Sequence, residues 1–164
     1  MNTSLLKTTA VATLLAGTLF TTQAALKVGD QLPDLASFKL AGKLPDSLKG
    51  KIVIVDFWAS WCQPCAKSFP VLDELQKKYG ERLVVIAVNV DEKSANMDAF
   101  LKKHPVSFTV VRDAEQKLVA AAEPATMPTS YIQDAEGKVR FLHNGFHGED
   151  TRKQYISEIE SLLK

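Results

Sequence analysis

The stretch Val55-Asp-Phe-Trp-Ala-Ser-Trp-Cys-Gln-Pro-Cys65 decides the fold, because it joins a strand pattern to a helix pattern through two cysteines. Residues 51–58 are mostly apolar and β-branched, which is typical of a central strand buried on both faces. From Trp61 to Tyr79, apolar side chains recur near helical spacing, and Gly80 follows as a stop signal. The sequence therefore predicts a buried strand that leads directly into a helix, with both cysteines at the junction.

Cys62 and Cys65 are the only cysteines of the chain. A disulfide between them would close a very short loop and constrain little of the unfolded chain. This small loop favours a chemical role for the disulfide over a structural one. A sulfur at the first turn of a helix lies near unpaired N–H groups and the positive end of the helix dipole, which stabilise a thiolate. We therefore expect Cys62 to be an attacking nucleophile that is open to solvent. Cys65, one turn later and facing inward, would resolve the mixed disulfide, and Pro64 suits the first turn.

Two other interpretations of the cysteine pair stay open. With His143 and His147, the cysteines supply the residue types of a Cys2His2 zinc site. The histidines lie far along the chain, across a predicted strand end and a Gly-rich loop, which does not match finger spacing. We therefore expect no metal. The second interpretation is an inert structural disulfide.

Residues 1–24 have the order of a secretory signal peptide. Lys7 supplies a positive start, an uncharged, mostly apolar stretch runs from Ala10 to Phe20, and small residues follow a polar patch. The apolar stretch is shorter than the roughly 20 residues that a spanning helix needs. Cleavage after Ala24 or Ala25 is therefore preferred over an uncleaved N-terminal anchor, and residues 25–164 are predicted to form one domain.

The charge balance excludes some partners. The 20 basic side chains become 19 once Lys7 is removed, which equals the 19 acidic ones. A neutral chain offers no support for binding to nucleic acid or to an anionic membrane surface.

Strand and helix patterns alternate along the rest of the chain, which predicts an α/β domain whose first two buried strands run parallel. The patterns predict strands at Leu35–Leu40, Arg82–Val90, Val106–Val111, Thr129–Gln133 and Lys138–His143, and helices at Ser94–Lys103, Ala114–Ala122 and Glu149–Leu163. Ser94 is the expected N-cap of its helix.

The motif VDFWASWCQPC at residues 55–65 resembles the active-site signature of the thioredoxin superfamily. Met127-Pro128-Thr129 resembles the loop whose proline is cis and faces the cysteine pair. The signal, the long segment before the first buried strand, the helix near residues 94–103 and the stretch PTSYIQDAEGKV are similar to the TlpA/ResA-like branch of bacterial thiol-disulfide oxidoreductases. The resemblance implies a thioredoxin fold, with a central mixed β-sheet flanked by helices, an N-terminal extension and an inserted helix.

The same resemblance implies roles for residues around the cysteines. Pro128 would be the cis-proline that keeps the pair accessible to a substrate backbone and away from metal, although an ordinary trans proline is the alternative. Trp61, Pro64 and Met127 would contact the substrate, whereas Trp58 is expected in the core.

Asp56 matches a buried acid of many thioredoxins. It stands in a strand of Ile, Val and Phe, and because a buried carboxylate is costly, it should favour the protonated form. We expect it to exchange a proton with Cys65 through water during resolution, and the alternative is a surface acid at a strand end. Ala87 replaces a lysine that often accompanies this acid, and Gln63-Pro64 replaces the commoner Gly-Pro. These departures leave the local proton chemistry and the redox potential open.

Taken together, the sequence predicts a periplasmic protein-disulfide reductase that acts on disulfide-bonded exported proteins. It would draw electrons from a membrane thiol-disulfide donor and work as a monomer without a cofactor. The same chemistry in reverse would make it an oxidase or isomerase, because direction follows from potential. A non-catalytic binding module or chaperone, and a thiol peroxidase, are the alternative functions.

Overall fold

The computed structural model describes residues 25–164, and the predicted signal peptide lies outside them. Its centre is one sheet with the strand order β3-β2-β1-β4-β5. The strands are β1 (Ile52–Trp58), β2 (Leu83–Asn89), β3 (Thr109–Arg112), β4 (Thr129–Gln133) and β5 (Val139–Asn144). β1 pairs in parallel with β2, and β2 with β3, whereas the β1–β4 and β4–β5 pairs are antiparallel. The predicted mixed sheet is confirmed.

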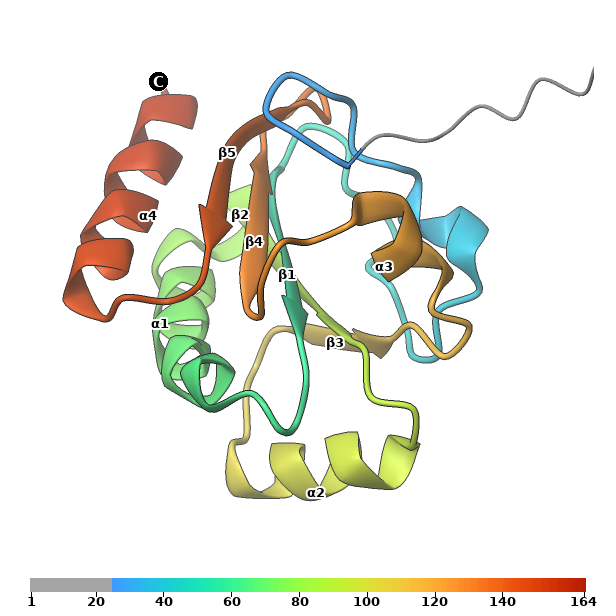
Figure 1. Ribbon diagram of the computed structural model, residues 1–164. Coiled ribbons are helices and arrows are strands. Elements are labelled where there is room, and N and C mark those ends of the chain that lie inside the picture. Colours follow the sequence, from blue (N-terminus) through green and yellow to red (C-terminus); the bar gives the residue numbers. More distant parts are fainter. Residues whose placement is uncertain (1–24) are drawn as a thin grey trace, which may run out of the picture.

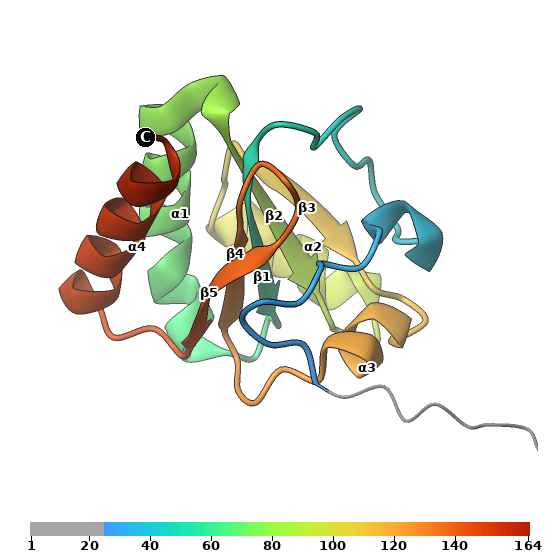
Figure 2. The same ribbon diagram turned by 90° about the horizontal axis from the view of Figure 1, so that it is seen from above.

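Helices cover both faces of the sheet (Figures 1 and 2). Helices α1 (Gln63–Tyr79) and α4 (Glu149–Leu162) lie on one face, and α3 (Lys117–Ala122) lies on the other, as does the 3-10 helix η1 (Leu35–Phe38). Helix α2 (Ser94–Lys103) lies at the end of the sheet where α1 begins, and a short 3-10 helix, η2 (Gly80–Arg82), leads from α1 into β2. Within residues 25–164, no helix is long and apolar enough to cross a bilayer.

β1 is the core strand, since all of its residues are buried. Alternate side chains point to opposite faces of a strand, so Ile54 and Trp58 join the core under α1, where Trp58 packs against Phe69 with ring centroids 4.8 Å apart. Val55 joins the opposite core with Leu118 of α3. This double burial holds the end of β1 rigidly, and the cysteine pair follows directly after it.

Two local predictions are wrong. Residues 35–40 do not form an edge strand: they begin with η1, in which the Asp34 carboxylate accepts a hydrogen bond from the Ala36 N–H at 3.1 Å. A side chain that bonds to its own nearby backbone favours such a turn over a strand. Ser94 is the first residue of α2 rather than its N-cap, because Lys93 takes the cap position without a side-chain bond.

The segment that precedes β1 touches both edges of the sheet. An isolated antiparallel bridge joins Gln31 to Lys138 beside β5, and a second joins Ala41 to Arg112 of β3. Gly42, with φ +126°, lies so close to β3 that an added Cβ would come within 3.1 Å of the Val110 carbonyl oxygen. The predicted N-terminal extension is therefore an integral part of this domain.

Candidate active site

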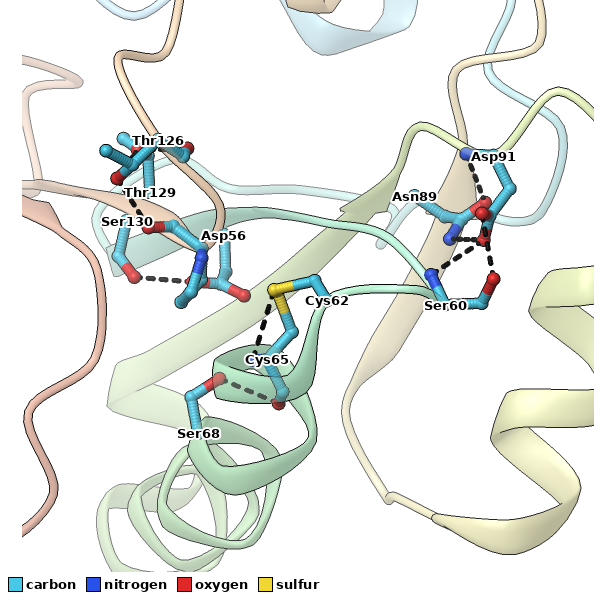
Figure 3. Close-up of a disulfide and its surroundings, with 11 residues drawn as sticks. Asp56, Ser60, Cys62, Cys65, Ser68, Asn89, Asp91, Thr126, Thr129 and Ser130 are labelled. Atoms are coloured by element: carbon cyan, nitrogen blue, oxygen red, sulfur yellow. Dashed lines mark hydrogen bonds between the residues drawn. A yellow bond between two sulfur atoms is a disulfide. The ribbon is translucent and has the colours of Figure 1, made fainter.

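The cysteine pair lies at the N-terminus of α1, in the place that the sequence predicts (Figure 3). Cys62 is the N-cap residue, with extended backbone, and its sulfur accepts a hydrogen bond from the Cys65 N–H at 3.2 Å. Pro64 occupies the first turn, where a missing N–H costs nothing. The two cysteines form a disulfide with their Cα atoms 5.3 Å apart. On reduction, the Cys62 sulfur would lie at the positive end of the helix dipole.

The expectation that Cys62 is open to solvent is wrong for this disulfide form. Cys62 is only 5% exposed and Cys65 is fully buried, because both belong to the hydrophobic cluster beneath α1. The neighbouring Trp61, by contrast, is 70% exposed. A hollow of about 380 Å³ opens at Cys62 between α1 and α2; it is lined by Ser60, Trp61, Cys62, Gln63, Ala66, Asn96, Ala99, Phe100, Lys103 and His104. This hollow gives a second sulfur an approach to Cys62.

The other predicted substrate contacts do not line this hollow, and they differ in exposure. Pro64 is exposed, Met127 is half-buried, and Pro128 is buried. The Met127–Pro128 peptide bond is cis. Two hydrogen bonds hold the loop at residues 126–129. The Thr129 hydroxyl donates to the Thr126 carbonyl at 2.7 Å, and the Gly145 N–H donates to the Pro128 carbonyl at 2.8 Å.

Asp56 is fully buried in the middle of β1, so it is not a surface acid at a strand end. It lies on the same face of β1 as Trp58, which is the face that α1 covers. Burial raises the pKa of its carboxyl from 3.8 to about 7, while a hydrogen bond from Ser130 opposes the rise. The carboxyl is thus biased toward its protonated form, as the sequence predicts.

Two partners of Asp56 were not predicted from the sequence. The Ser130 hydroxyl donates to Asp56 Oδ1 at 2.5 Å, and the Tyr155 hydroxyl lies 2.7 Å from the same Ser130 oxygen. Asp56 Oδ2 has no hydrogen-bond partner. Figure 3 draws the Asp56 side chain between Ser130 and the disulfide. The only sequence signal was a serine after Pro128-Thr129 and a tyrosine on the apolar face of the last helix.

The histidines of the alternative zinc site are not brought to the cysteines. His143 Nε2 lies 2.7 Å from Glu158 Oε2, and its ring packs edge-on against Tyr155. Among residues 25–164, no three His, Cys, Asp or Glu side chains are grouped closely enough to hold a metal ion.

A second buried network, also missed, anchors the loop that presents the cysteines. Asp91 accepts two hydrogen bonds from Ser60, one from its N–H at 3.0 Å and one from its hydroxyl at 2.9 Å. The Asn89 side-chain amide donates to the same carboxylate at 2.7 Å. The loop between β1 and Cys62 is thereby tied to the end of β2 (Figure 3). The signal in the sequence was a pair of polar residues, Asn89 and Asp91, that ends an apolar run.

Replacing Asp91 with alanine should lower the free energy of unfolding by about 2 to 3 kcal/mol, because Ser60 and the buried Asn89 amide lose their acceptor. Chemical denaturation of the purified domain measures this loss. The matched control is Glu92→Ala, which removes an exposed neighbouring carboxylate and should change the value by less than about 0.5 kcal/mol. Equal small effects in both variants would contradict the anchoring role.

Comparisons with known proteins agree with this geometry. The sequence model of the Redoxin family matches residues 27–161. The thiol-disulfide oxidoreductase ResA of Geobacillus thermodenitrificans is 32% identical over 145 residues, which cover 86% of this chain and 83% of that protein. A solved structure described as a DsbE thiol:disulfide interchange protein of Chlorobium tepidum is 36% identical and covers 85% of this chain and 100% of its own, with a TM-score of 0.77.

A third relative is the exposed lipoprotein thioredoxin of Streptococcus pneumoniae. It is 32% identical, covers 68% of this chain and 87% of its own, and has a TM-score of 0.59. The family match spans nearly all described residues, and these relatives share the fold that places Cys62 and Cys65 at the start of α1. The chain therefore belongs to the Redoxin family, as a thiol-disulfide oxidoreductase of the ResA/TlpA-like kind within the thioredoxin superfamily.

Proposed function

We propose that this protein reduces disulfides of exported proteins through the Cys62–Cys65 dithiol. The observation that carries the proposal is the position of the cysteine pair at the N-terminus of α1, where the helix dipole stabilises a thiolate. Asp56, a buried acid that titrates near neutral pH, lies on the sheet face that this helix covers. In this proposal Cys62 attacks the substrate, and Asp56 accepts the proton that Cys65 must lose.

In the first step, the Cys62 thiolate attacks one sulfur of the substrate disulfide. A Cys62–substrate bond forms as the substrate S–S bond breaks, and the departing substrate sulfur leaves as a thiolate that takes a proton from solvent. The N–H groups of the first turn of α1 stabilise the attacking thiolate before this step. Trp61, Pro64, Met127 and Pro128 form the surface that the substrate backbone and its flanking residues contact.

In the second step, Cys65 gives up its proton and attacks the Cys62 sulfur. The Cys62–Cys65 bond forms, the mixed disulfide breaks, and the second substrate sulfur is released and protonated. Asp56 accepts the Cys65 proton through water and later returns it to solvent. Two electrons pass from the protein dithiol to the substrate disulfide, so the protein ends oxidised, in the form described above.

A cycle of this kind needs a source of electrons. The leader-like order of residues 1–24 supports export, with residues 25–164 as the mature domain and the bacterial periplasm as its compartment. That compartment is kept oxidising, so the dithiol must be regenerated, and a membrane thiol-disulfide protein is the donor that can carry electrons across. The relative from Streptococcus pneumoniae is itself described as an exposed lipoprotein. We propose that the domain acts as a monomer without a cofactor.

Trapping tests this function. In a Cys65→Ser variant, Cys62 can attack but nothing resolves the bond, so mixed disulfides with substrates and with the membrane donor should accumulate. Expression with the natural leader, followed by acid quenching and non-reducing electrophoresis, displays them, and mass spectrometry identifies the partners.

The matched control is the Cys62→Ser, Cys65→Ser double variant, which should trap nothing. If the Cys65→Ser variant also traps nothing while the protein is folded and exported, the proposed attack by Cys62 is wrong. Capture of cytoplasmic proteins alone would contradict the exported substrates and the periplasmic location.

A further inference from the structure

The hydrogen-bond chain behind the cysteines has a defined direction. A serine hydroxyl carries one hydrogen, and the Ser130 hydrogen is used to donate to Asp56 Oδ1. The Tyr155 hydroxyl, 2.7 Å away, must therefore donate to the Ser130 oxygen whenever Asp56 is ionised. The chain runs from Tyr155 of α4 through Ser130 of β4 to one oxygen of the acid in β1.

This arrangement leaves the two oxygens of the carboxyl unequal. Oδ1 is engaged by Ser130, whereas Oδ2 is buried without a partner. A buried carboxylate oxygen without a partner is costly while it carries charge, and because Oδ1 already accepts from Ser130, Oδ2 is the oxygen free to hold or release a proton. We propose that Ser130 and Tyr155 are positioning residues, which hold Oδ1 and thereby reserve Oδ2 of Asp56 for proton exchange with the cysteine pair.

The proposal deepens the role of Asp56 in the proposed function and rests on it. Ser130 acts directly on the carboxyl, and Tyr155 acts through Ser130 by orienting and polarising its hydroxyl. The titratable groups of this region are Tyr155 and Glu158 of α4, His143 of β5, Asp56 itself and the two cysteines at the start of α1. On its other side, Asp56 has Ala87 of β2 as its strand neighbour, which carries no charge.

The carboxyl can be followed directly in the disulfide form, where neither cysteine titrates and no substrate is needed. The probe is the ¹³Cγ signal of labelled aspartate across pH 4 to 10, with the Asp56 signal identified by its absence in Asp56→Asn. In the unaltered protein the midpoint should lie near 7. Ser130→Ala removes a donor that favours the carboxylate, so the midpoint should rise by about one pH unit.

Tyr155→Phe keeps the ring packing and removes only the hydroxyl. Its midpoint should rise by a smaller amount, on the order of half a pH unit, because Ser130 can still donate. The double variant should match Ser130→Ala alone, since the hydroxyl of Tyr155 bonds to Ser130 and not to the acid. The control is Tyr131→Phe, which also removes a buried hydroxyl from its acceptor, the Ala122 carbonyl on the opposite side of the sheet, and should leave the midpoint unchanged.

An unchanged midpoint in Ser130→Ala overturns the proposal. So does full additivity in the double variant, or a midpoint near 4 in the unaltered protein. Each of these results leaves the trapping of substrates by Cys65→Ser intact, whereas failure of trapping leaves the titration intact. The two proposals therefore fail separately.

Discussion

Replacing Cys62 with serine should lower disulfide reduction by roughly 10³-fold or more, to a level near that of the buffer. A serine hydroxyl is not ionised at neutral pH and forms no bond that Cys65 can exchange, so the first step has no nucleophile. Cys65 cannot replace it, because it is fully buried one turn below. Reduction of a disulfide-linked model protein, with a chemical thiol as the electron source, measures the loss.

The Cys65→Ser variant separates the two roles of the pair. It should still react once with a disulfide, to give a stoichiometric mixed disulfide, while its turnover is also lost. Both variants should remain folded, because the Cys62–Cys65 bond closes too short a loop to add much stability. Retained reduction by Cys62→Ser would contradict the attack by Cys62. Full function of Cys62→Ser in cells, with reduction lost in vitro, would instead favour a chaperone or binding module in which the cysteine pair does no chemistry.

Replacing Asp56 with asparagine should change how stability depends on pH. The unfolding free energy of the variant, compared with that of the unaltered chain, should become larger as the pH rises. The Asp56 carboxyl has the ordinary aspartate pKa of 3.8 in the unfolded chain. In the folded protein its pKa is about 7, because burial disfavours the charged form. Between pH 3.8 and about pH 7, the native state therefore still holds this proton, whereas the unfolded state has already released it. Stability is full below about pH 4 and falls as the pH rises to about 7.

The loss has a predictable size. It amounts to about 1.4 kcal/mol per pH unit over this window, or on the order of 4 kcal/mol in total. An asparagine carries no proton to lose, so the variant lacks this slope. Denaturation curves at pH 4, 6 and 8 should show the difference in unfolding free energy between variant and parent growing with pH, whatever its value at pH 4.

The control is Asp98→Asn, in which an exposed carboxylate of α2 is neutralised, and it should shift all three curves alike and by less than about 0.5 kcal/mol. A difference between Asp56→Asn and the parent that stays constant from pH 4 to 8 would show that Asp56 titrates alike in both states. That result would remove its role as proton acceptor as well.

Structural features that depend on neighbouring residues could be predicted from the sequence. The apolar run of β1, the proline and cysteine spacing at the start of α1 and the alternation of strands with helices all report local preference and burial. The α/β domain, its parallel first strands and the place of the pair follow from them, whereas the mixed sheet was implied by the family resemblance. The burial of Asp56 was also foreseeable, because a lone acid in a run of Ile, Val and Phe has nowhere else to point.

Features that depend on residues far apart in the sequence could not be predicted from it. Nothing near Ser130 in sequence indicates Tyr155, and nothing near Ser60 indicates Asp91, since both networks exist only once the sheet has formed. The exposure of Cys62 was misjudged for a similar reason. It depends on the bond to Cys65 and on packing beneath α1 rather than on position at a helix end.

The segment around Gln31, which precedes the first strand, is held by parts of the molecule that the ribosome adds near the end. Gln31 pairs with Lys138, and its side chain donates to the Glu136 carbonyl across a separation of 105 residues. Contacts that close so long a loop form late. A nascent chain that stops before Glu136 lacks both of these contacts, so the part of the N-terminal segment around Gln31 is fixed to the sheet only when synthesis is nearly complete.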